Sequence, residues 1–162
     1  MTEIDLIRLA EKAVSKLKEK NKTLALAESC TGGWVSKIIT DVSGASAVYQ
    51  GGVCSYSNEV KVNILGVKED TLATFGAVSE QVAIQMAEGV KTALNSDIGI
   101  GITGIAGPLS DNTKKPVGLV YVALADESKT LCTELRNNFT KDIRLQNRFT
   151  AVETALNLLG DI

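Results

Sequence analysis

The sequence of 162 residues contains no histidine. This absence excludes, within the chain, a Ser-His-Asp triad, a Cys-His pair and every metal site that uses imidazole ligands. If the protein catalyses a hydrolytic reaction, its general base must therefore be a lysine, an aspartate, a glutamate or a tyrosine.

Long apolar runs are also missing, since none approaches the roughly 20 residues of a membrane-spanning helix. The first residues, MTEIDLIRLAEK, are acidic and amphipathic and lack the blocks of a signal peptide. The three cysteines, Cys30, Cys54 and Cys132, are an odd number without metal-ligand spacing, which is typical of a reducing compartment. We therefore expect a cytoplasmic protein with no membrane partner and no metal site.

The charges give no sign of a nucleic-acid partner, because the net charge is -2 and the lysines and arginines form no basic stripe. Hydrophobic residues make up 44% and charged residues 22% of the chain, as in an ordinary globular protein. We expect a single domain over residues 1–162, in which loops and helix ends hold any anionic ligand locally.

Hydrophobic periodicity predicts an alternating order of elements, α-β-α-β-α-β-β-β-α. The early alternation indicates parallel strands with crossover helices, and the late strand pair indicates an antiparallel addition. The predicted fold is a three-layer α/β/α sandwich with a mixed, mostly parallel sheet. The predicted helices cover 3–20, 34–39, 79–94 and 145–159, and the predicted strands cover 24–27, 46–56 (broken at Gly51 and Gly52), 98–102, 117–124 and 130–135.

The strand at 98–102 alternates strictly between isoleucine and glycine. One face of this strand carries isoleucine side chains and the other face carries none. A bare face allows a helix or a ligand to approach the backbone closely.

Three segments lie where the predicted strands end, which is where ligands collect in open α/β sheets. The first is Glu28-Ser29-Cys30-Thr31-Gly32-Gly33, in which the serine sits at a strand-to-helix turn. N–H groups after the serine can hold a phosphate or the oxyanion of an acyl-transfer intermediate. The segment resembles a hydrolase nucleophile elbow without its first glycine, since Ala27 stands there. The alternative is a helix cap followed by a tight turn.

The second and third segments supply a candidate base and a candidate anion site. Lys61 follows the second strand and can act as a base only if burial or neighbouring cations lower its pKa to roughly 7–8. Taken alone, Lys61 reads better as a solvated surface lysine, and Tyr56 reads equally as a core residue with a satisfied hydroxyl. The segment Thr103-Gly104-Ile105-Ala106-Gly107-Pro108 can form a nest of N–H groups or a plain structural turn.

Together these segments resemble the deamidase family built on the C-terminal domain of CinA, also called PncC. The resemblance covers nearly the whole chain and looks like the stand-alone form of the domain. It rests on five motifs in matching order: LALAESCTGG at 24–33, YSNEVK at 56–61, GAVSE at 76–80, GITGIAGP at 101–108 and KPVGLVYVAL at 115–124.

The resemblance implies hydrolysis of nicotinamide mononucleotide to nicotinate mononucleotide and ammonia, in pyridine-nucleotide recycling, without a cofactor. It implies Ser29 as nucleophile, Lys61 as base and Tyr56 as a further catalytic residue, and a Ser-Lys dyad agrees with the absence of histidine. We expect a homo-oligomer. The expected substrate-binding residues are Cys30, Thr31, Gly32, Gly33, Thr103, Gly104, Gly107 and Arg144.

Two stretches depart from the family pattern. Residues 109–113 replace a glycine-rich stretch, which affects the shape of the phosphate or ribose pocket. Lys141-Asp142-Ile143-Arg144 replaces a Gly-Asp-Arg, with Arg148 beyond. Arg144 is the candidate match and would suit a phosphate, or it is a surface charge at a helix start.

Other functions remain open from the sequence. The chain could be a non-catalytic nucleotide-binding module, or a serine amidase or esterase that acts on another nucleotide-like substrate. Cys30 is an alternative nucleophile because a helix start lowers a thiol pKa. Adjacent residues on a turn point in different directions, however, so we favour a structural role for Cys30.

Overall fold

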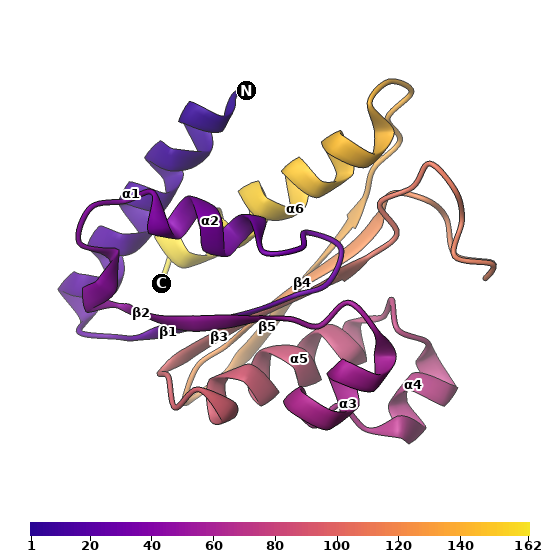
Figure 1. Cartoon of the computed structure of the whole chain (residues 1–162), viewed down its shortest axis with the longest axis horizontal. Coiled ribbons are helices and arrows are strands. Elements are labelled where there is room, and N and C mark those ends of the chain that lie inside the picture. Colours follow the sequence, from indigo (N-terminus) through magenta and orange to yellow (C-terminus); the bar gives the residue numbers. More distant parts are fainter.

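The protein is described by a computed structural model that covers residues 1–162. Five strands form one sheet in the order β2-β1-β3-β4-β5, and helices cover both faces (Figure 1). The strands are β1 (Leu24–Glu28), β2 (Tyr49–Cys54), β3 (Ile98–Gly104), β4 (Leu119–Ala125) and β5 (Thr130–Arg136). The predicted three-layer α/β/α fold is confirmed.

The sheet is mixed because β1 pairs in parallel with β2 and β3, whereas β4 is antiparallel to both β3 and β5. Four strands therefore point the same way and β4 points the other way, as the late strand pair predicted. The parallel register places Leu24 beside Ile98 and Glu28 beside Ile102. The carboxyl ends of β1 and β3 consequently lie next to each other at one edge of the sheet.

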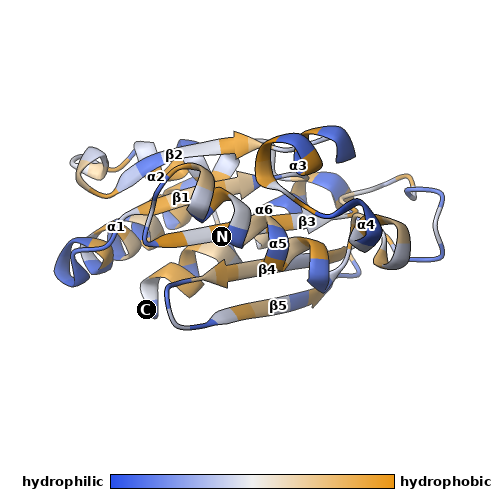
Figure 2. Cartoon of the chain, turned by 90° about the horizontal axis from the view of Figure 1, so that it is seen from below, coloured by the Kyte–Doolittle hydropathy of each residue, from blue (hydrophilic) through white to orange (hydrophobic).

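The helices form two outer layers, visible on opposite sides of the sheet in Figure 1. One layer holds α1 (Glu3–Lys20), α2 (Trp34–Thr40) and α6 (Ile143–Gly160), and the other holds α3 (Asn58–Leu65), α4 (Glu69–Phe75) and α5 (Glu80–Ala93). A short 3-10 turn, η1 (Ala45–Ala47), precedes β2. Hydrophobic residues concentrate along the strands and the inner helix faces, whereas the outer turns are hydrophilic (Figure 2). No helix combines the length and apolar character that crossing a membrane requires.

Local sequence signals explain several element boundaries. Thr2 and Asp5 form a reciprocal capping box at the start of α1, and Ser79 caps α5 by accepting the Val82 N–H. The predicted break in the second strand is a register shift and not an interruption: β2 is continuous through Gly51 and Gly52 and begins only after η1, but its pairing with β1 skips Gln50, just before Gly51. Helices α3 and α4 were not predicted; each is no longer than eight residues and too short for a clear period.

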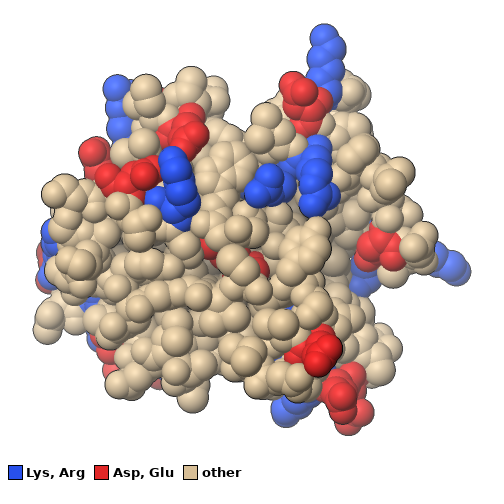
Figure 3. Space-filling model, viewed as in Figure 1, with Lys and Arg blue, Asp and Glu red and all other residues tan.

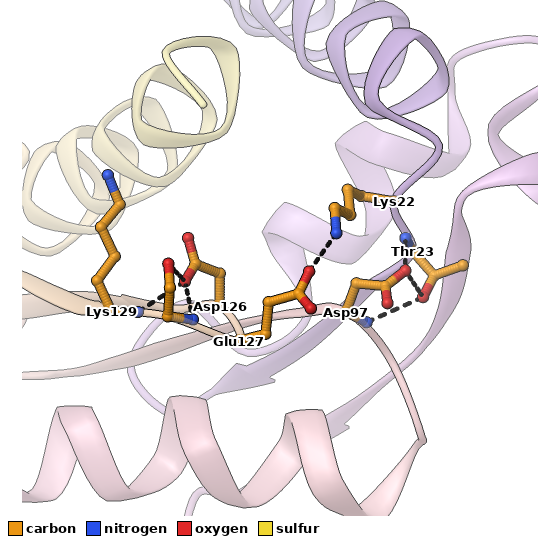
Figure 4. A network of polar contacts seen from close by, with 7 residues as sticks. Lys22, Thr23, Asp97, Asp126, Glu127 and Lys129 are labelled. Carbon is orange, nitrogen blue, oxygen red and sulfur yellow. Dashed lines mark hydrogen bonds and ion pairs between the residues drawn. The ribbon is translucent and has the colours of Figure 1, made fainter.

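The end of the sheet opposite the loops after β1 and β3 is held by polar contacts (Figure 4). Asp97 accepts hydrogen bonds from the N–H and hydroxyl of Thr23, which ties the starts of β1 and β3 together. Asp126 accepts the N–H groups of Ser128 and Lys129 and so closes the β4–β5 hairpin.

Acidic and basic side chains are interspersed across the face in Figure 3 and form no continuous basic surface there.

The bare face of β3 lies directly against α5. A β-carbon added at Gly101 would lie 2.3 Å from the Ala83 carbonyl oxygen and 2.6 Å from the Ala87 nitrogen. Both are backbone atoms, so they cannot rotate away. The expectation that a helix or a ligand approaches this face is confirmed for the helix.

We predict that Gly101→Ala lowers the free energy of unfolding by at least about 2 kcal/mol, because the added methyl group overpacks the β3–α5 contact. Urea unfolding followed by circular dichroism measures this change. Gly160→Ala is the matched control, since the three atoms nearest to its β-carbon would all belong to the flexible Lys12 side chain, at 3.3–3.5 Å. Equal midpoints for the two variants would contradict the close approach of α5.

Candidate active site

Three loops meet where β1, β2 and β3 end, as the strand order requires. They enclose a cavity of about 180 Å³. Typical ligand pockets measure about 300–1,000 Å³, so this cavity suits one ring of a ligand better than a whole nucleotide. It is lined by Ser29, Cys30, Tyr56, Asn58, Lys61, Ala77, Val78, Thr103, Gly104, Ala106, Asp111 and Arg144.

A serine and a lysine face each other in this cavity. Ser29 directly follows β1, and Lys61 lies in the first turn of α3, which Ser57 caps by accepting the Val60 N–H. The Lys61 Nζ lies 3.1 Å from the Ser29 Oγ. Lys61 is 1% exposed and Ser29 is 8% exposed, so the pair is shielded from bulk water.

The other contacts of the lysine define the direction of its lone pair. Lys61 Nζ donates to the carbonyl oxygen of Ser55 at 2.7 Å and to that of Tyr56 at 3.3 Å. A neutral amine has two N–H groups and one lone pair. When both N–H groups bond to the carbonyls, the lone pair remains for the proton of the Ser29 hydroxyl. This geometry can activate serine as a nucleophile.

Burial lowers the pKa of Lys61 from its ordinary value to about 8. The side chain forms no ion pair that would stabilise its charge, since none of the salt bridges includes it. The neutral amine is therefore about a tenth of the population at pH 7 and about half at pH 8. The reading of Lys61 as a solvated surface lysine is wrong.

The loop after β1 is organised by the buried carboxylate of Glu28. This carboxylate accepts the Thr31 hydroxyl at 2.7 Å, the Val35 N–H at 2.9 Å, and the N–H and hydroxyl of Ser36 at 3.0 and 2.9 Å. It therefore satisfies the first free N–H groups of α2, whose preceding residue Gly33 provides no side-chain cap. The expectation that the helix start binds a substrate anion is corrected, because a carboxylate of the chain already occupies it.

Free N–H groups nevertheless remain beside the serine. The backbone N–H groups of Cys30, Thr31 and Gly33 donate no hydrogen bond within the protein. The Ser29 N–H, in contrast, donates to the Ile102 carbonyl of β3, which fixes the serine to the neighbouring strand. Of these unpaired donors, the Cys30 N–H belongs to a residue that lines the cavity.

Cys30 is poorly suited to nucleophilic attack. The residue is 6% exposed, and burial raises the pKa of its thiol to about 12. The reactive thiolate is therefore scarce at neutral pH. The burial agrees with the structural role that we favoured.

Tyr56 and Arg144 lie together at the mouth of the cavity. Arg144 donates from one terminal nitrogen to the Tyr56 hydroxyl at 3.2 Å and from the other to the Gly107 carbonyl at 2.9 Å. Tyr56 is 66% exposed, so its reading as a core residue is wrong. The guanidinium joins the loops after β2 and β3 at the rim.

The structure brings seven of the eleven predicted site residues to the cavity wall: Ser29, Cys30, Tyr56, Lys61, Thr103, Gly104 and Arg144. The other four do not line it. Thr31 is fully buried with its hydroxyl on Glu28, Gly32 and Gly33 form the turn into α2, and Gly107 lies behind the rim.

Sequence reasoning missed the organising role of Glu28 and the contacts of Arg148, although Glu28 stands beside the candidate serine. It also missed Asn58 and Asp111 in the cavity wall. Thr103 lines the cavity but donates its hydroxyl to the Ala77 carbonyl at 2.8 Å, so it also anchors the segment before α5.

The fold and the site define a class of protein: an α/β domain with a buried serine and lysine in contact at the carboxyl edge of its sheet. The sequence model of the CinA C-terminal domain matches residues 6–162, and the chain belongs to this family. A competence/damage inducible protein of Agrobacterium tumefaciens has a similar solved structure, with a TM-score of 0.90, 38% identity, and coverage of 96% of this chain and 93% of that one.

Relatives of two lengths are similar to the chain. A CinA-like protein of Thermotoga neapolitana is 48% identical over 149 residues, which are 90% of this chain and 36% of the relative. The nicotinamide-nucleotide amidohydrolase PncC of Escherichia coli is 48% identical over 125 residues, 77% of this chain and 76% of the relative. The chain thus spans about a third of the longer relatives and most of the shorter one.

The burial of Lys61 predicts a specific pH dependence of stability. In the unfolded chain the amine has its ordinary pKa of 10.5, and in the folded protein its pKa is about 8. Between these values the unfolded state binds more protons, so this group makes stability rise with pH. Lys61→Met removes the effect. We expect wild type to gain about 2 kcal/mol relative to Lys61→Met between pH 7 and 10.

Urea unfolding of both proteins at each pH measures this difference, and the other titrating groups cancel in the comparison. A constant difference across the range would contradict the lowered pKa of Lys61.

Proposed function

We propose that the chain hydrolyses the carboxamide of nicotinamide mononucleotide, giving nicotinate mononucleotide and ammonia. The reaction would serve pyridine-nucleotide recycling. The observation that carries this proposal is the contact between Ser29 and Lys61. It provides a shielded nucleophile and a base of suitable pKa in a chain without histidine. The similarity to PncC supports the choice of substrate.

In the proposed first step, Ser29 Oγ attacks the carboxamide carbon while neutral Lys61 accepts the hydroxyl proton. The carbonyl π electrons move to the oxygen, and the free N–H groups of Cys30 and Thr31 stabilise the resulting oxyanion. The Lys61 ammonium then donates a proton to the amine as the C–N bond breaks. Ammonia leaves, and a nicotinoyl ester remains on Ser29.

In the second step, Lys61 is neutral again and takes a proton from water. The hydroxide attacks the ester carbon, and Lys61 returns the proton to Ser29 Oγ as the C–O bond breaks. Nicotinate mononucleotide leaves and the starting enzyme is restored. Water can reach the cavity because its mouth opens at Tyr56 and Arg144.

The size of the cavity suggests how the nucleotide lies. The pyridine ring fits inside, with its carboxamide at Ser29, and the ribose phosphate extends past the rim. Arg144 stands at the rim with a guanidinium that can hold a phosphate by two hydrogen bonds. We assign Arg144 to the phosphate and Tyr56 to holding that guanidinium in place.

We predict that Ser29→Ala and Lys61→Met each lower the rate of ammonia release from nicotinamide mononucleotide by about 10³-fold or more. The first removes the nucleophile and the second removes the base. An enzyme-coupled ammonia assay measures the rates. Ser15→Ala and Lys20→Met, both exposed on α1, are matched controls that should keep the wild-type rate.

The wild-type rate should also rise with pH through about 8, because Lys61 accepts a proton only in its neutral form. Full activity in the Ser29→Ala protein would refute the proposed mechanism. Binding of the mononucleotide without ammonia release by wild type would indicate a binding module instead, and turnover of other carboxamides or esters alone would indicate a different serine hydrolase.

The assignment of Arg144 gives a separate prediction. Arg144→Ala should raise the KM for nicotinamide mononucleotide about 10-fold or more, since a charge-assisted hydrogen bond is lost. The KM for nicotinamide riboside, which has no phosphate, should change far less. Steady-state kinetics with both compounds measures the ratio. An equal effect on both would show that Arg144 acts on the loops and not on the phosphate.

A further inference from the structure

Arg148 binds the loop that carries the proposed nucleophile. It lies on α6, and its Nε donates to the Cys30 carbonyl at 3.0 Å while Nη2 donates to the Thr31 carbonyl at 3.1 Å. Its guanidinium carbon also lies 5.4 Å from the centroid of the Trp34 ring. One side chain thus contacts three of the five residues that follow Ser29.

These contacts determine how a peptide group next to Ser29 is oriented. In a trans peptide the C=O and N–H point in opposite directions. The Cys30 carbonyl shares its peptide with the Thr31 N–H, so a guanidinium on that carbonyl directs the Thr31 N–H away from Arg148. The preceding peptide group, which carries the Cys30 N–H, is held separately, because the Ser29 carbonyl accepts the Gly32 N–H at 3.1 Å.

Arg148 is the only donor to the Cys30 carbonyl, whereas the Thr31 carbonyl also accepts the Trp34 N–H at 3.1 Å. Glu28 holds the loop through the Thr31 hydroxyl and the start of α2 and not through these carbonyls. Gly32 and Gly33, with φ of 61° and 94°, give the turn little stiffness of its own. A cation on a carbonyl also polarises its peptide group and strengthens the N–H as a donor.

We propose that Arg148 is a positioning residue for catalysis: it fixes and polarises the Cys30–Thr31 peptide group so that the Thr31 N–H, together with the Cys30 N–H, stabilises the oxyanion. The proposal rests on the acyl-transfer function proposed above. Arg148 does not line the cavity and acts through the backbone. Its effect therefore falls on the transition state and spares the binding of substrate.

The test compares Arg148→Ala and Arg148→Lys with wild type and with Arg136→Ala, a control arginine on the exposed side of β5. Lysine keeps the charge and much of the stem, so this variant serves if the alanine variant folds poorly. We expect kcat for the mononucleotide to fall about 10²-fold, as for loss of an oxyanion donor. KM should stay within about 3-fold, and the pH midpoint set by Lys61 should not move.

Guanidinium chloride at millimolar concentration should restore part of the kcat of Arg148→Ala and none of that of Ser29→Ala. Fluorescence of Trp34, the single tryptophan of the chain, reports whether the loop stays folded. A kcat within about 3-fold of wild type would overturn the proposal, and so would a loss of kcat with an equal rise in KM or a shifted pH midpoint.

A second readout separates this proposal from the choice of substrate. p-Nitrophenyl acetate can acetylate Ser29 and release p-nitrophenolate through the same kind of oxyanion, and mass spectrometry locates the acetyl group. If wild type releases no ammonia from the mononucleotide but the Arg148 variants are acetylated more slowly than wild type, the proposed substrate is refuted and the proposed role of Arg148 is supported. Equal acetylation rates in wild type and the variants would refute the role of Arg148. No reaction of wild type with either compound would refute both proposals.

Discussion

The site depends on the removal of one amine from water. Lys61 is among the largest fully buried side chains, and its partners are two carbonyls and one hydroxyl. An ammonium in such surroundings loses its hydration without gaining a counter-charge, so its neutral form is favoured. The rest of the fold makes this possible: the two residues after β2, Ser55 and Tyr56, direct their carbonyls to the amine, and α3 starts with a cap that places Lys61 on its inner face.

The site is assembled from segments that are distant in the sequence. Beside the loops after β1, β2 and β3, α6 contributes four hydrogen bonds to loop carbonyls, from Arg144, Asn147 and Arg148. Asn147 is buried and leaves its Oδ1 without a partner, which carries a desolvation cost. Polar side chains near the start of α6 thus join the loop that carries Ser29 to the loop after β3.

The sequence predicted the layers, the mixed sheet and most of the cavity wall, because these follow from hydrophobic period and from where strands end. It missed α3 and α4, whose few turns give no period, and it placed a break in β2 at two glycines that the sheet tolerates. The burial of Lys61 could not be predicted from the sequence either, since a lone lysine reads as solvated until a neighbouring helix is known to cover it. The same holds for Glu28, whose acceptor role depends on the path of the chain into α2.

The contact between β3 and α5 has a consequence for how related sequences can diverge. There is no space for a side chain at Gly99 or Gly101, because both lie directly against Ala83 and Ala87 of α5. A larger residue on the strand would therefore require a compensating change in the helix, and a larger residue on the helix a change in the strand. The opposite face of β3 carries isoleucines in a large core, where one apolar residue can replace another of similar size. Substitutions along this single strand should therefore accumulate on one face only, and the other face should change in concert with α5 or not at all.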